Sequence, residues 1–212
     1  MPAITTRYFR DVSEAENRIQ DMGLQLENLR TVRRVALDAA RRANPYFPAN
    51  AAGTFSYQYG TWALRDANIT DDWHIDRTNG VECIRNDNLK IRIAFCNVDI
   101  ACDDYYTPRA RSDKGAGAER ATQSTLFSDL EDFTSTEAAS SEWSFYYFML
   151  DPDGRVELTW PVVEGGKFVN YVERIYLFRD GSDNEAAVPS ISGFDDDDIA
   201  DGFEPEVSRK TL

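Results

Sequence analysis

The chain has 212 residues, 42% of them hydrophobic, and a formal net charge of -14. This hydrophobic share excludes a wholly disordered chain and favours one globular domain, whereas the acidic balance argues against direct nucleic-acid binding through bulk positive charge. The first residues lack the apolar core of a signal peptide, and no stretch reaches the length of a membrane span. We therefore predict a soluble, cytoplasmic protein without a membrane partner.

The cysteines and the histidine argue against a metal centre. Cys83, Cys96 and Cys102 are odd in number and lack CxxC spacing, so neither a disulfide framework nor a zinc knuckle is expected. His74 is the sole histidine, and a zinc site would have to consist mainly of carboxylates, which is uncommon. We interpret His74 as a polar loop residue and expect no metal and no cofactor.

Residues 12–43 are predicted to form one long helix. Ser13 and Glu16 have the spacing of a capping box, and Asn44-Pro45 ends the pattern. Apolar residues recur at steps of three and four: Val12, Ala15, Ile19, Met22, Leu26 and Leu29. We interpret them as a stripe that faces the core; a seam that joins copies into a homo-oligomer is the alternative.

The second half of this helix is rich in arginine. The residues are Arg30, Arg33, Arg34, Arg41 and Arg42. Cations near the C-terminal end of a helix interact favourably with its dipole. We prefer this explanation, with a nucleic-acid-binding face as the alternative.

From Thr54 the apolar periodicity changes to two, which predicts a strand through Leu64. Its aromatic residues Phe55, Tyr57 and Tyr59 alternate with polar ones, so we expect them on the buried face of a sheet; a platform that stacks on bases is the alternative. A second strand is expected at residues 89–95, extending to 100 after a phase shift. A loop is expected at 103–124 and a short helix at 124–133.

Residues 143–178 predict an antiparallel meander. Trp143–Leu150 is apolar on both faces, which is typical of a central strand. Asp151-Pro152-Asp153-Gly154 is the signature of a type I turn into a strand at 155–163, and a glycine-rich turn leads to a strand at 168–178. The expected fold is α+β, with the long N-terminal helix packed on a mainly antiparallel sheet in a single domain, 1–179.

Residues 180–212 are predicted to form an acidic, flexible tail. Ten acidic residues and no lysine or arginine lie between Asp180 and Glu206. The candidate binding residues are Phe194, Asp195, Asp196, Asp197, Asp198 and Phe203. Charge steers a partner and a few apolar residues hold it, so this composition favours an accessory protein that binds a basic protein surface, for example on a nucleic-acid-handling protein. Such small acidic chains are common among accessory proteins of viruses and mobile elements.

Residues 66–90 offer the main alternative, a metal-dependent nuclease or phosphodiester hydrolase. Asp76, Glu82 and Lys90 are the candidate catalytic residues, because carboxylates hold Mg²⁺ and a lysine can support hydrolysis. The expected element order resembles the restriction-nuclease core, but that family's acid–x–lysine signature is absent because Asn88 stands two residues before Lys90. A turn rich in Asp, Asn and Gly explains the same residues without catalysis.

The basic segment 109–117 can form a loop that contacts an acidic partner or a phosphate, although it matches no phosphate-binding motif. The chain can also be a structural subunit that oligomerises through the helix at 12–43.

Overall fold

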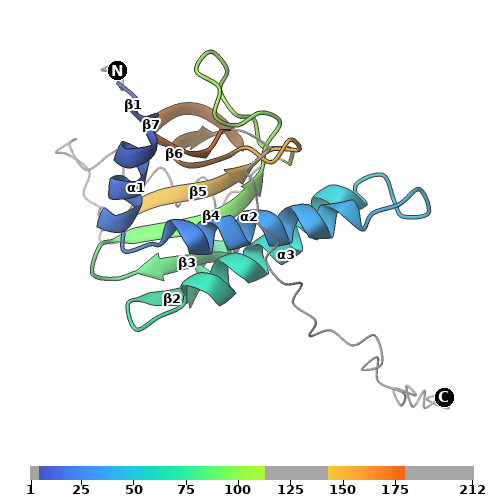
Figure 1. Ribbon diagram of the computed structural model, residues 1–212, viewed down its shortest axis with the longest axis horizontal. Helices are drawn as coiled ribbons and strands as arrows, with labels where there is room; N and C mark the ends of the chain where they lie inside the picture. The colour runs from blue at the N-terminus through green and yellow to red at the C-terminus, as the bar shows by residue number, and fades with distance from the viewer. Residues whose placement is uncertain (1–4, 113–142, 180–212) are drawn as a thin grey trace, which may run out of the picture. The chain divides into compact units, whose positions relative to one another are not determined.

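The computed structural model describes residues 5–112 and 143–179, all within one compact unit, Met1–Gly181. The described residues form an α+β fold (Figure 1). Its helices are α1 (Val12–Asp21), α2 (Leu26–Arg41) and α3 (Ala51–Asn68), with a short 3₁₀ turn, η1 (Thr78–Gly80). Its strands are β1 (Arg7–Phe9), β2 (Trp73–Asp76), β3 (Cys83–Asn86), β4 (Ile91–Asn97), β5 (Ser144–Leu150), β6 (Val156–Glu164) and β7 (Lys167–Phe178).

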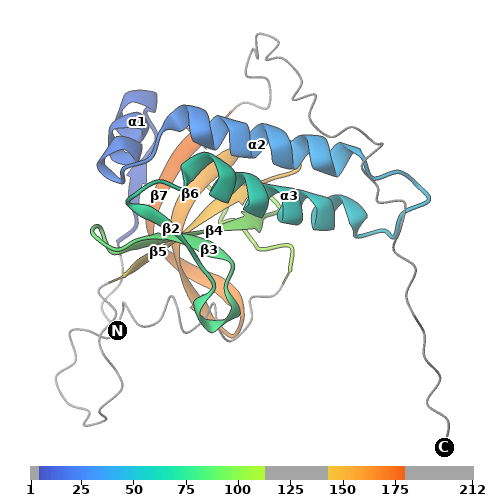
Figure 2. The same cartoon turned by 90° about the horizontal axis from the view of Figure 1, so that it is seen from below.

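The strands form one mixed sheet in the order β1-β7-β6-β5-β4-β3-β2. The pairs β1–β7 and β4–β5 are parallel, and the others are antiparallel. The three helices lie on one face of this sheet, and α2 and α3 run side by side along it (Figures 1 and 2). None of the helices in the described residues has the length and apolar character needed to cross a membrane.

The sheet is buried on both faces, which confirms the prediction of a central strand at 143–150. On the helix side, Phe95 and Phe148 pack with residues of the three helices. On the other side, Tyr147 and Met149 pack with Cys102 and its neighbours in the segment that follows β4. The predicted turn is also present, since the Gly154 amide donates to the Asp151 carbonyl oxygen at 3.1 Å.

The prediction of a single helix at 12–43 is wrong. Gly23 adopts a φ of 69°, in the left-handed region that ends helices, so the segment divides into α1 and α2. The N-cap of α1 is Asp11 and not the predicted Ser13 of a capping box, because the Asp11 carboxylate accepts the Ser13 amide at 2.9 Å. Apart from Val12, which is exposed, the apolar stripe does face the core: Ile19 and Leu29 are fully buried.

The strand expected from Thr54 to Leu64 is also wrong, because this segment belongs to helix α3. Its buried residues are Ala51, Ser56, Gly60, Thr61, Ala63, Leu64 and Asn68. These mostly small residues let α3 approach the sheet closely, and a Cβ added at Gly60 would lie 2.4 Å from the Phe95 ring. The alternating aromatic residues are therefore not a buried sheet face: Tyr57 and Tyr59 are 42% and 39% exposed.

The segment 66–87 is not only a turn, because it contains the strands β2 and β3, which the sequence did not predict. The strand expected from residue 89 begins at Ile91, with Leu89 exposed in the turn before it. The short helix expected at 124–133 and the acidic tail at 180–212 lie outside the described residues.

Candidate functional site

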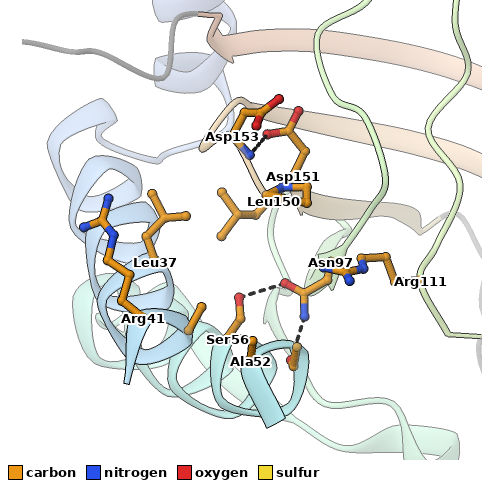
Figure 3. A pocket seen from close by; sticks show the side chains of 12 residues that line it. Leu37, Arg41, Ala52, Ser56, Asn97, Arg111, Leu150, Asp151 and Asp153 are labelled. Carbon is orange, nitrogen blue, oxygen red and sulfur yellow. Dashed lines mark hydrogen bonds between the residues drawn. The ribbon is translucent and has the colours of Figure 1, made fainter. Parts of the chain in front are cut away.

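A cavity of about 290 Å³ lies beside the ends of the parallel strands β4 and β5, under α2 and α3 (Figure 3). The carboxyl ends of adjacent parallel strands are a common place for ligand sites. Five stretches of chain line it: Leu37, Ala40 and Arg41; Ala52, Gly53 and Ser56; Asn97; Arg111; and Leu150, Asp151, Pro152 and Asp153. Because sequence reasoning placed residue 56 on a strand, it missed this site.

Two hydrogen bonds connect β4 to α3 at one wall of the cavity. The Ser56 hydroxyl donates to Asn97 Oδ1 at 2.8 Å, and Asn97 Nδ2 donates to the Gly53 carbonyl oxygen at 2.9 Å. A serine nucleophile needs an adjacent base to accept its proton. An amide oxygen is not such a base, so this arrangement positions α3 and does not activate Ser56.

Asp151 has a structural role at the opposite wall. Its carboxylate accepts the backbone amides of Ala101, Asp153 and Arg155 at 2.9–3.0 Å. The Arg155 side chain adds a further hydrogen bond at 2.7 Å. These contacts occupy the carboxylate, so Asp151 shapes the turn after β5 and is not available as a general base.

The remaining lining combines an apolar centre with charged groups at the mouth. Leu37 and Leu150 face the hollow from opposite sides (Figure 3). Arg41 pairs with Asp38 at 2.9 Å, and Arg111 is exposed. The cavity can therefore hold a small apolar group, such as a side chain of a bound protein, beside two arginines.

Asp76, the first catalytic candidate, is buried and already neutralised. Its carboxylate accepts the Thr78 amide at 3.0 Å and the Thr78 hydroxyl at 2.6 Å, and it forms an ion pair with Arg92 at 3.2 Å. Burial opposes ionisation, but the Thr78 hydrogen bonds and the nearby arginines hold the pKa of Asp76 below its ordinary value.

Glu82 and Lys90 also have separate partners. Glu82 pairs with Arg65 and, at 3.1 Å, with Arg77, and the hydrogen bond from Arg65 lowers the pKa of this carboxyl. The Lys90 Nζ atom lies 5.2 Å from the centre of the Trp143 ring. No hydrogen bond or ion pair joins any two of Asp76, Glu82 and Lys90, although all three are described.

The other potential ligands and nucleophiles are dispersed. His74 lies on the edge strand β2, so the prediction that it is a loop residue is wrong. All three cysteines are buried, and burial raises the pKa of Cys83 to about 12, so this thiol stays protonated. Within residues 5–112 and 143–179, no three His, Cys, Asp or Glu side chains are grouped so that they could hold a metal ion.

The predicted binding residues Phe194, Asp195–Asp198 and Phe203 lie outside the described residues, as does the part of the basic segment after Ser112. Comparison with protein-family models, curated proteins and solved structures found no match to this chain.

Proposed function

We propose that this chain is an accessory protein that binds a basic surface of a partner protein through its acidic C-terminal segment. The observation that carries the proposal is the run of ten acidic residues without a lysine or arginine between Asp180 and Glu206. A partner that handles nucleic acid fits this charge best, because such proteins present clustered lysines and arginines to phosphate.

The composition of the segment supports binding more than solubility alone. Ile191, Phe194, Ile199 and Phe203 stand among the acids. Segments that fold on binding combine charge, which speeds encounter, with apolar residues, which slow dissociation. Phe194 and Phe203 are the proposed anchors on either side of the Asp195–Asp198 run.

The described body offers more support for binding than for the hydrolase alternative. Asp76 and Glu82 are each neutralised by arginine, so neither is open to a metal ion without loss of an ion pair. In the cavity beside β4 and β5, Ser56 donates to an amide oxygen, the Asp151 carboxylate is occupied by hydrogen bonds, and Asp153 pairs with Arg155 at 3.2 Å. It is suited to receive an apolar side chain of the partner.

The test uses the full-length chain. The partner is first captured from a lysate of the source cells, and association is then followed by stopped-flow at several salt concentrations. Replacing Asp195–Asp198 with asparagine is expected to lower the on-rate and flatten its salt dependence, because exposed charges are screened beyond about 8 Å at physiological ionic strength. Phe194→Ala and Phe203→Ala are expected to raise mainly the off-rate. An asparagine variant with the wild-type on-rate and salt slope contradicts the proposal.

A further inference from the structure

The outward side of α3 carries an exposed aromatic surface. Phe55, Tyr59 and Trp62 are spaced four and three residues apart, so they lie on one side of the helix. Trp62 is 46% exposed and Tyr59 is 39% exposed. Phe47, in the connection from α2, extends the surface, since its ring meets Phe55 edge-on with centroids 5.2 Å apart. Contiguous exposed apolar surface of this kind is typical of interaction sites.

Two opposite charges stand on either side of Trp62. The Arg42 guanidinium lies over the Tyr59 ring, 5.6 Å from its centroid. Asp66 follows Trp62 by four residues, on the same side of α3, and is exposed. Neither charge forms an ion pair with another residue of the described part of the chain. With a rise of about 1.5 Å per residue, Tyr59 lies about 4.5 Å before Trp62 along the helix axis and Asp66 lies about 6 Å after it.

We propose that this surface pairs with the same surface of a second copy, around a twofold axis that passes close to Trp62. Such a rotation exchanges the two sides of Trp62, so that Arg42 of each copy faces Asp66 of the partner subunit. A twofold interface must be self-complementary in this way. The two tryptophans then meet at the centre, where fully desolvated aromatic residues contribute most to binding.

The arrangement of charge selects a second copy over another occupant. A cation on one side of a central tryptophan and an anion on the other complement themselves when rotated by half a turn, whereas a purely basic or acidic partner would leave one of them facing a like charge. The stripe at 12–43, which the sequence offered as an oligomerisation seam, is not available, because Ile19, Met22 and Leu29 are buried in this chain's own core.

The first test is the mass of the full-length chain by sedimentation equilibrium over a wide range of concentration. We expect a reversible monomer–dimer equilibrium that Trp62→Ala weakens by about tenfold or more. Tyr105→Ala is the matched control, because Tyr105 is fully exposed outside this surface and its removal should leave the equilibrium unchanged. A chain that stays monomeric, or a Trp62→Ala variant that dimerises like the wild type, overturns the proposal. The proposal is also overturned if the chain is monomeric and Trp62→Ala weakens its capture of a different protein.

A charge exchange tests the geometry. Arg42→Glu alone and Asp66→Arg alone should each be monomeric, because each homodimer would contain two like-charge contacts. An equal mixture of the two variants should dimerise, since the heterodimer contains one Glu–Arg contact and one Arg–Asp contact. Both positions are exposed, so circular dichroism should show that both variants fold. If the mixture stays monomeric while the wild type dimerises, the twofold arrangement is wrong.

Discussion

Arg174 of β7 binds Glu157 of β6 at two points, with Nε 3.0 Å from Oε1 and Nη2 2.7 Å from Oε2. The exposed fractions of the two side chains are 1% and 0%. Glu157 also accepts the Cys102 amide at 2.8 Å and the Thr159 hydroxyl at 2.7 Å. Arg174 reaches the Tyr106 carbonyl oxygen at 3.3 Å. The pair therefore holds the segment after β4 against the face of the sheet that carries no helix.

Glu157→Gln is expected to destabilise the chain by about 3–5 kcal/mol, because it leaves the buried charge of Arg174 without a counter-charge. Urea denaturation followed by tryptophan fluorescence measures the free energy of unfolding. Glu164→Gln, at an exposed position at the end of the same strand, is the control and should change stability by less than about 0.5 kcal/mol. A loss at Glu157 no larger than that of the control would mean that the pair does not hold the fold.

Two glycines of α3 should respond in opposite directions to alanine. Gly60→Ala places a methyl group 2.4 Å from the buried Phe95 ring and should destabilise the chain by about 1–3 kcal/mol. At Gly53 nothing lies within 4 Å of an added Cβ, so Gly53→Ala should stabilise by up to about 1 kcal/mol through helix propensity. Thermal unfolding of both variants checks this. Equal effects would show that α3 does not approach the sheet as closely as described.

The meander could be predicted from the sequence because its signals are local. The run Trp143–Leu150 is apolar on both faces, and the turn at Asp151–Gly154 is specified by its own four residues. By contrast, α3 was misassigned because the alternation of Phe55, Tyr57 and Tyr59 is more conspicuous than the small residues that pack on the sheet. The helical signal was the spacing of Ser56, Gly60, Ala63 and Leu64.

The candidate site could not be predicted from the sequence, because it depends on contacts between distant residues. The cavity requires the parallel pairing of β4 with β5, whose partners such as Phe95 and Phe148 are far apart in the chain. The neutralisation of Glu82 by Arg65 likewise depends on α3, whose sequence predicts a strand. The sequence shows where the charged residues stand along the chain, but their pairing follows only from the fold.

The stability of the chain should fall in acid partly through Asp76. Burial raises its pKa, but hydrogen bonds from Thr78 and the charges of Arg92 and Arg85 lower it by more, to below the ordinary 3.8. Because the folded pKa is below the unfolded one, this carboxylate stabilises the fold above about pH 4, and the contribution is lost as the pH falls through the folded pKa.

Asp76→Asn should therefore be less stable than the wild type at neutral pH and lose less stability below about pH 4. Urea denaturation at a series of pH values measures both effects. Asp21→Asn, at an exposed position, is the control and should follow the wild-type pH profile. If Asp76→Asn also loses stability in parallel with the wild type, Asp76 does not contribute to the acid sensitivity.

Added Mg²⁺ or Mn²⁺ should not stabilise the full-length chain through the Asp76–Glu82 region. A divalent ion there would have to displace Arg92 from Asp76, or Arg65 and Arg77 from Glu82. A true site at a hundredfold excess of ion over its Kd would raise the free energy of unfolding by about 2.7 kcal/mol. Calorimetry of the wild type and of the Asp76→Ala, Glu82→Ala double variant separates the cases. If the ion raises the thermal unfolding midpoint of both proteins, it binds acidic residues elsewhere in the chain. If it raises the midpoint of the wild type alone, a metal site exists here and the hydrolase is favoured over the binding protein.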